Sequence, residues 1–130
     1  MKRNLIIAIV AILSLSSCDK GTTSPCIETK SASAIVTEFP ETIKAGTIQT
    51  VEIKYILESD CGEFDHFEIS QDGPAFNVEI VTKYQGCTCD LQLKERSAFF
   101  DVDVDFPGTY KFNFWLSDGD YDSRTVTVFE

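Results

Sequence analysis

Hydrophobic and polar residues alternate along most of the chain from Ser33 onward, and this period of two is typical of β-strands. Val51, Ile53 and Tyr55, for example, alternate with a glutamate and a lysine. The segments with this pattern are residues 33–39, 47–57, 61–71, 75–84, 99–106, 111–116 and 124–129. Short strands separated by frequent turns, with no convincing helix, predict an all-β fold, an antiparallel sandwich of about seven strands.

A turn at residues 72–74 joins two of these segments into a predicted hairpin. Pairing Gln71 with Phe76 across this turn fixes the register of the two strands. The apolar side chains of both strands then lie on one face, as a half-buried antiparallel pair requires. The opposite pairs that result are Ile69 with Val78 and Phe67 with Ile80.

The first 18 residues have the pattern of an export signal. Lys2 and Arg3 precede an apolar run at residues 5–13, and small residues follow before Cys18. The apolar run is shorter than the ~20 residues that a membrane-spanning helix needs. We therefore predict a signal peptide at residues 1–17 rather than a transmembrane helix.

The end of this segment, Leu15-Ser16-Ser17-Cys18, resembles the lipobox of bacterial lipoproteins. The resemblance implies that the Cys18 thiol carries a diacylglycerol, that cleavage follows residue 17, and that the new amine receives an acyl chain such as palmitate. Two or more chains hold a protein firmly at a bilayer. We expect a cell-envelope lipoprotein anchored to a membrane, with the outer membrane favoured and no cofactor beyond these lipids.

Composition limits the remaining chain to one small acidic domain. We expect residues 18–32 to be the lipidated cysteine and a polar tether, and residues 33–130 to be the sandwich. Loss of Lys2 and Arg3 with the signal changes the formal net charge from −10 to −12. Because phosphate groups are repelled by such a surface, nucleic acid is not expected as a partner. We expect the partner to be a protein or a glycan of the envelope.

Four cysteines besides Cys18 remain, and an even number in an exported chain predicts disulfide bonds. They are Cys26, Cys61, Cys87 and Cys89. The hairpin register places Cys61 opposite Gly86, and a bulge at that glycine would bring Cys87 within reach. This favours a Cys61–Cys87 bond and leaves Cys26 for Cys89. A thiolate metal site is the alternative, but no further cysteine pair with zinc-site spacing is present.

Two groups of aspartates are candidate calcium ligands. One follows a predicted strand face: Asp101, Asp103 and Asp105. The other lies in a predicted loop at residues 118–122 and resembles the start of an EF-hand: Asp118, Asp120 and Asp122. Ser123 and Phe129 stand where that loop needs a glycine and an acidic residue. A solvated strand face and a polar hairpin turn explain both groups, so no metal is predicted.

No catalytic residue is predicted. His66 is the only histidine, and the chain has no nucleophile elbow, zinc-protease helix or phosphate-binding loop. A hydrolase that uses His66 remains the least favoured alternative. Trp115 and Tyr121 lie near one end of the last predicted hairpin, where they could form a platform for a sugar or a peptide. Packing in the core or at its rim explains them as well.

Three resemblances bear on the fold. Residues 106–110 (Phe-Pro-Gly-Thr-Tyr) resemble the late corner of immunoglobulin-like sandwiches, where a tyrosine ties the loop to its strand. The strands that follow are similar to the last hairpin of fibronectin type III, polycystic-kidney-disease and bacterial immunoglobulin-like modules. Residues 61–64 and 83–89 (Cys-Gly-x-Phe and Lys-Tyr-x-Gly-Cys-x-Cys) resemble small lipoproteins of the Bacteroidota. These resemblances imply a sandwich fold and no activity.

The sequence therefore favours a membrane-anchored lipoprotein whose sandwich binds or scaffolds without catalysis. An alternative from another functional class is an inhibitor or chaperone that protects the envelope from a cationic hydrolase such as lysozyme. The acidic surface would steer the encounter with such an enzyme.

Overall fold

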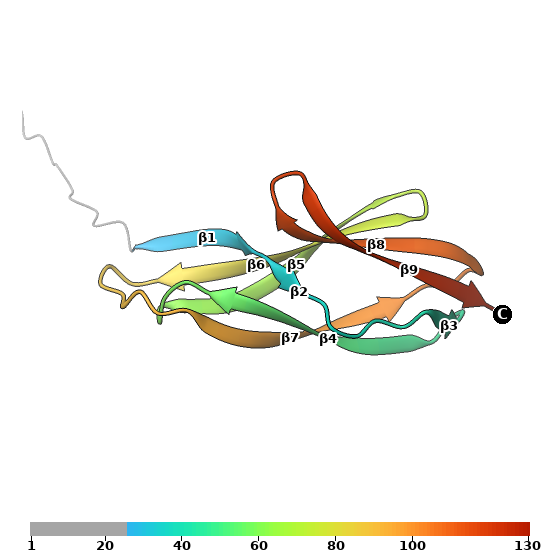
Figure 1. Ribbon diagram of the computed structural model, residues 1–130, viewed down its shortest axis with the longest axis horizontal. Coiled ribbons are helices and arrows are strands. Elements are labelled where there is room, and N and C mark those ends of the chain that lie inside the picture. Colours follow the sequence, from blue (N-terminus) through green and yellow to red (C-terminus); the bar gives the residue numbers. More distant parts are fainter. Residues whose placement is uncertain (1–25) are drawn as a thin grey trace, which may run out of the picture.

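The computed structural model describes residues 26–130, which form nine β-strands in two facing sheets (Figure 1). The strands are β1 (Ile27–Ala32), β2 (Ala34–Ile35), β3 (Thr42–Lys44), β4 (Ile48–Leu57), β5 (Gly62–Asp72), β6 (Ala75–Gln85), β7 (Lys94–Asp103), β8 (Gly108–Ser117) and β9 (Asp120–Phe129). The predicted all-β sandwich is confirmed. The predicted signal peptide, Cys18 and the tether up to residue 25 lie outside the described residues. Within residues 26–130, no helix is long and apolar enough to cross a membrane.

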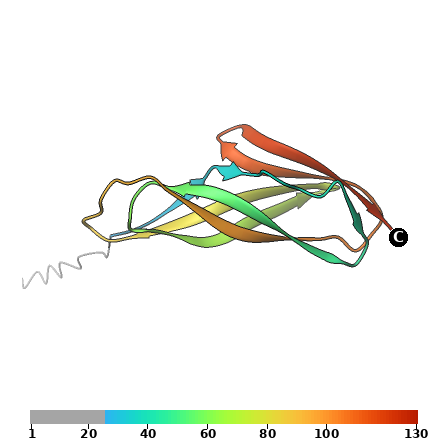
Figure 2. The same ribbon diagram turned by 60° about the horizontal axis from the view of Figure 1, so that its bottom comes forward.

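The larger sheet is organised around β6. Its strand order is β1-β6-β8-β9-β3, and β5 pairs with the other edge of β6. The smaller sheet has the order β2-β4-β7. Most pairings are antiparallel, as predicted, but β3 pairs with β9 and β6 pairs with β8 in parallel. The β8–β9 hairpin projects from the body of the sandwich, as Figure 2 shows.

The core forms where the apolar faces of the two sheets meet. Phe114, Val126 and Val102, from both sheets, are fully buried. The rings of Phe100 and Phe114 meet edge to face with their centroids 5.7 Å apart, which is a favoured arrangement of aromatic rings. Burying a side chain of this size contributes about 1.5–3 kcal/mol to folding, so this contact between the sheets is a main source of stability.

The predicted β5–β6 hairpin register is confirmed. Gln71 lies opposite Phe76, and the pairs Ile69 with Val78 and Phe67 with Ile80 follow. Farther from the turn, the register shifts between Phe64 and His66, so Gly62 lies opposite Tyr84. The bulge therefore falls at Asp65 and not at Gly86, where the sequence suggested it.

Several predicted boundaries differ from the structure. Of the predicted strand at residues 33–39 only Ala34–Ile35 forms a strand, and the strand predicted at residues 99–106 is β7, which spans Lys94–Asp103. The sandwich begins at Ile27 and not at Ser33, because residues 27–32 pair along β6 as β1. Most of β1 is exposed or half-buried and shows no apolar alternation, so its pattern resembled a polar tether. The last loop is also shorter than predicted. Strand β9 already begins at Asp120.

The immunoglobulin-like corner is confirmed at the start of β8. The Tyr110 hydroxyl donates a hydrogen bond to the carbonyl oxygen of Phe106 over 2.9 Å. Gly108 has φ = +152°, a conformation that favours glycine, and places its backbone against the Tyr110 ring. The tyrosine thus ties the turn to the strand that follows it, as the resemblance implied.

Phe114→Ala should lower the free energy of unfolding by about 3–5 kcal/mol, because it leaves a cavity where the two sheets meet. Phe99 is 69% exposed on β7, so Phe99→Ala should change stability by less than about 0.5 kcal/mol. Urea unfolding of the two variants and of the parent protein measures these changes in the free energy of unfolding. Equal losses would contradict the assignment of the core.

Candidate functional site

Two disulfide bonds tie the end of the sandwich at which β1 begins (Figure 1). They join Cys26 to Cys87 and Cys61 to Cys89, with Cα–Cα distances of 5.0 and 5.7 Å. All four predicted cysteines are therefore disulfide-bonded. The predicted pairing, Cys61 with Cys87 and Cys26 with Cys89, is wrong.

The correct pairing follows from the position of β1. Ile27 lies opposite Gln85, and the backbone N–H of Gly86 donates to the Cys26 carbonyl oxygen over 2.9 Å. Cys87, the next residue, therefore reaches Cys26 on the β1 side of β6. The chain then returns to the β5 side, where Cys89 reaches its partner.

Gly86 allows this crossing. Its φ is +141°, and a Cβ atom there would lie 2.8 Å from the Cys61 Sγ and 3.3 Å from the Cys89 Sγ. Both the backbone conformation and the close contact require glycine at this position. The sequence contained the Gly-Cys-x-Cys pattern, but its geometry depends on β1, which the pattern did not predict.

The basic group beside the disulfides is already neutralised. Lys30 Nζ lies 2.9 Å from a carboxylate oxygen of Glu58 and 5.4 Å from the centre of the Tyr84 ring. The hydrogen bond to Glu58 raises the pKa of Lys30 above its usual value. Lys30 is therefore engaged in an exposed ion pair.

One group of three potential metal ligands occurs within residues 26–130: Asp60, Cys61 and Cys89. Both sulfur atoms belong to a disulfide bond, so they are not available as thiolates. The aspartates that resembled an EF-hand are not gathered into a common group. Asp122 instead accepts hydrogen bonds from Arg124 at 2.9 and 3.0 Å, which raise the pKa of that guanidinium.

The other predicted candidates lie apart from one another. Asp101, from the aspartate group on the strand face, accepts a hydrogen bond from the Thr50 hydroxyl on the outer face of the smaller sheet. His66 lies on β5 next to the bulge, is exposed, and contacts the carboxylate of its neighbour Asp65.

Trp115 and Tyr121 are the candidates that the structure brings together. They lie opposite each other in the β8–β9 hairpin and face away from the core. Both line a cleft of about 210 Å³ between this hairpin and the β5–β6 hairpin, which we call the aromatic cleft. Its lining residues are Glu68, Ile69, Ser70, Asn77, Val78, Glu79, Trp115 and Tyr121. Tyr121 is 44% exposed, so core packing does not account for it.

The cleft forms where the large sheet forks. Strand β8 pairs with β6 only as far as Val78 opposite Phe114, and β1 takes over this edge of β6 at Ile80. Beyond the fork β8 diverges, and its Trp115 is left without a partner on β6. Glu79 lies between the two pairings and accepts a hydrogen bond from the Ser31 hydroxyl of β1.

Hydrogen bonds between polar side chains connect the strands beside the aromatic cleft. The Asn113 amide donates to the Asn77 side-chain oxygen over 3.0 Å, and the Ser123 hydroxyl donates to the Asn113 side-chain oxygen over 2.6 Å. These bonds connect β6, β8 and β9 across the outer face. Glu68 and Glu79 lie directly opposite each other, an unfavourable pairing of like charges, and no basic residue lines the cleft. The arrangement can therefore stack a planar or apolar group and accept hydrogen bonds from a donor or a cation.

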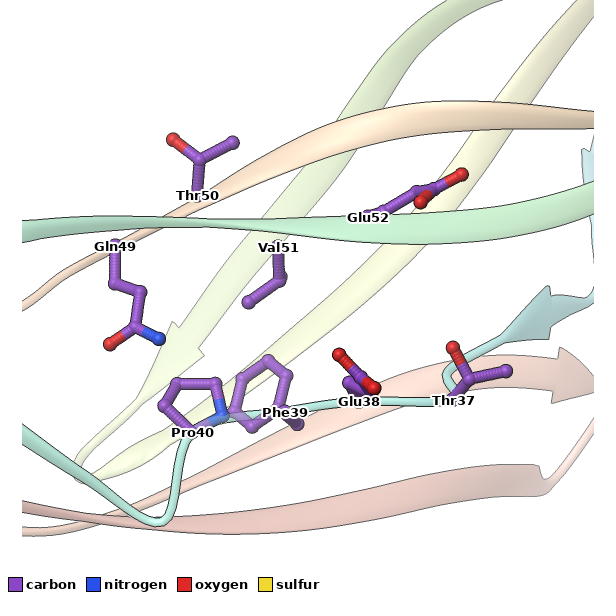
Figure 3. Close-up of a pocket in the computed structure, with 8 residues that line it drawn as sticks. All are labelled: Thr37, Glu38, Phe39, Pro40, Gln49, Thr50, Val51 and Glu52. Atoms are coloured by element: carbon purple, nitrogen blue, oxygen red, sulfur yellow. The ribbon is translucent and has the colours of Figure 1, made fainter.

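A second hollow, with a volume of about 310 Å³, lies beside β4 (Figure 3). It is lined by residues Gln49–Glu52 of β4 on one side and by the segment Thr37–Pro40 on the other. Val51 and Gln49 point toward Phe39 and Pro40, whereas Thr50 and Glu52 point away from them. We call this hollow the β4 groove. No pattern in the sequence predicts this groove, because it depends on which sheet each short strand joins.

Comparison with known proteins identifies one family. A family model described as the ORF11 beta-sandwich domain matches residues 51–128. No curated protein matches the chain, and no solved structure does. The matched region begins in β4 and ends in β9, so it includes all lining residues of the aromatic cleft but not β1.

The paired variant Cys26→Ser with Cys87→Ser should retain the second bond and expose no free thiol among the four positions. This variant should lose about 4 kcal/mol of stability, because the Cys26–Cys87 bond that it removes closes a loop with a sequence separation of 61. The matched control, Cys61→Ser with Cys87→Ser, removes one partner from each bond. Thiol titration of the unfolded proteins measures the difference, and free thiols in the first variant alone would contradict the pairing.

Proposed function

The chain belongs to the ORF11 beta-sandwich domain family, and from that premise we propose that it is a lipid-anchored, non-catalytic binding module of the bacterial cell envelope. The lipid would be carried by Cys18, and the sandwich would present the aromatic cleft to a partner. The observation that carries the binding role is the convergence of Trp115 and Tyr121 on one cleft.

The disulfide bonds support an exported protein. Two such bonds persist in oxidising compartments and are rare in the cytosol. Cys26 stands eight positions after Cys18, a stretch of chain that spans at most about 29 Å. The disulfide-bonded end would therefore lie close to the membrane, and Ile27 and the C-terminus lie at opposite ends of the sandwich (Figure 1). The C-terminal end is thus the one that would point outward.

The charge of the cleft supports a basic partner. Its two carboxylates have no basic neighbour among the lining residues, while its aromatic faces attract cations. This observation favours the second candidate function, an inhibitor or chaperone that binds a cationic hydrolase such as lysozyme. In either role the cleft would hold an ammonium or guanidinium group of the partner between Glu68, Glu79 and the rings.

The anchor is tested by Cys18→Ala in the native host. The parent protein should remain in the membrane fraction, and globomycin should make its unprocessed form accumulate. The variant should lose its membrane association, because alanine has no thiol to carry the diacylglycerol that holds the chain. The control Cys26→Ser with Cys87→Ser should remain membrane-bound. Normal processing in globomycin, or a variant that stays in the membrane, would contradict the anchor.

The cleft is tested through its own fluorescence, because Trp115 is the only tryptophan of the chain. Titration with lysozyme should change this emission. The binding that it measures should weaken as the salt concentration rises, because salt screens the charges. Glu68→Gln with Glu79→Gln should weaken binding by about tenfold or more, since each charged hydrogen bond contributes about 1.5–3 kcal/mol. The control Glu63→Gln with Glu95→Gln makes the same change of charge outside the cleft.

The same titration separates a basic partner from a glycan. Emission that responds to a neutral chitin oligosaccharide and is insensitive to both glutamate pairs would contradict the basic partner and support a sugar-binding module. No response to either ligand would contradict the cleft as the binding site.

A further inference from the structure

The two edges of β4 are used very differently. On one side β7 pairs with β4 along its whole length, from Ile48 to Leu57. On the other side β2 pairs only with Lys54 and Tyr55. Within residues 26–130 no strand pairs with that edge from Ile48 to Ile53. More than half of an otherwise central strand therefore has an open edge.

The segment after β2 would be expected to continue this pairing. In the register set by β2, residues 36–40 run antiparallel beside residues 49–53. Two contacts with β9 hold that segment away. Arg124 donates to the Val36 carbonyl oxygen over 2.6 Å, and the Thr127 N–H donates to the Glu41 carbonyl oxygen over 2.9 Å. Pro40 also has no N–H to donate. The gap is therefore kept open by contacts of the folded domain.

We propose that an extended, basic segment of a partner protein adds as a strand to the open edge of β4 in the β4 groove. A row of unpaired N–H and C=O groups on a strand edge is a template for another strand, and main-chain hydrogen bonds supply the affinity. The chemistry that recognises the partner is thus an extended backbone with alternating side chains.

The side chains of the groove define that alternation. On the inner side Val51 is 7% exposed and points toward Phe39, so the added strand would place an apolar side chain beside them. On the outer side the groove is bordered by Glu38 and Glu52, with no basic residue among its lining. Opposite charges across neighbouring strands are favourable, so lysine or arginine belongs at the outward positions.

The other long edges are less suited to a partner. The edge strand β5 has a bulge at Asp65, which bends the strand and interrupts pairing. The edge strand β7 carries charges near both ends, including Lys94, Arg96 and Asp103, which discourage strand addition. Residues 49–53 of β4 contain no bulge, and the charged residue among them, Glu52, suits a basic strand. The segment 37–40 also forms a second wall of the groove.

The test measures amide hydrogen exchange of the mature, lipidated protein in neutral detergent, followed by mass spectrometry. The probe is a seven-residue peptide in which lysine alternates with valine and threonine. Exchange in residues 48–53 should slow at least tenfold when the peptide is added. A matched peptide with glutamate in place of lysine, and one with a central proline, should have no such effect, because they lack the charge and the backbone donor respectively.

The charge-reversed variant Glu38→Lys with Glu52→Lys should bind the lysine peptide at least tenfold more weakly. The control Glu63→Lys with Glu130→Lys changes the net charge equally and should bind normally. Glu68→Gln with Glu79→Gln should also bind normally, so the outcome is independent of the aromatic cleft. Unchanged exchange in residues 48–53 at about 1 mM peptide, slowing confined to β5 or β7, or equal binding by both charge-reversed variants would overturn the proposal.

Discussion

Strand β6 is the element on which the rest of this structure depends, because its two edges pair with three neighbours. One edge pairs with β5 over almost its whole length. The other is shared, with β8 beside the first residues of β6 and β1 beside the last. The hydrogen-bond register of each pairing is fixed by the need to keep Val78 and Ile80 in the core, since a slip of one residue would turn both outward.

Two places along this shared edge have functional consequences. At its end β6 leads into a crossing loop, where β1 and β5 lie on opposite sides and each supplies one cysteine for a disulfide bond. In its middle, the change from β8 to β1 opens the fork that holds Trp115. The same sheet thus carries both disulfide bonds at the end where β1 begins and forms the candidate binding cleft away from that end. The β4 groove arises in a similar way, because the chain after β2 leaves one sheet to join the other.

Local patterns were sufficient for those elements whose partners are adjacent in sequence. The alternation around Val51 and the turn at residues 72–74 predicted β4 and the β5–β6 hairpin, including its register. The Tyr110 corner was also readable, because the tyrosine bonds to a carbonyl only four residues away. In these cases the signal and the contact lie in the same short segment.

Features that depend on distant pairing could not be predicted in the same way. Strand β1 is held by β6, more than 40 residues later, and has little apolar alternation of its own. Because β1 was not predicted, the position of Cys26 beside β6 was unknown, and the cysteine pairing could not be predicted correctly. Trp115 and Tyr121 were recognised as candidates, whereas Glu68 and Glu79 join them only because β6 and β8 pair in parallel. Their outward positions on alternating strands were the only signal that the sequence offered.

The most direct measurement is a nuclear magnetic resonance assignment of backbone contacts along β6 in the mature protein. Contacts of Asn77 with Asn113 and of Val81 with Ser31, found in the same sample, are expected from an edge shared between β8 and β1. Contacts that run from β6 to β8 along the whole edge, with none to Ser31, would contradict it. The fork, the cysteine pairing and the aromatic cleft would then all lose their basis.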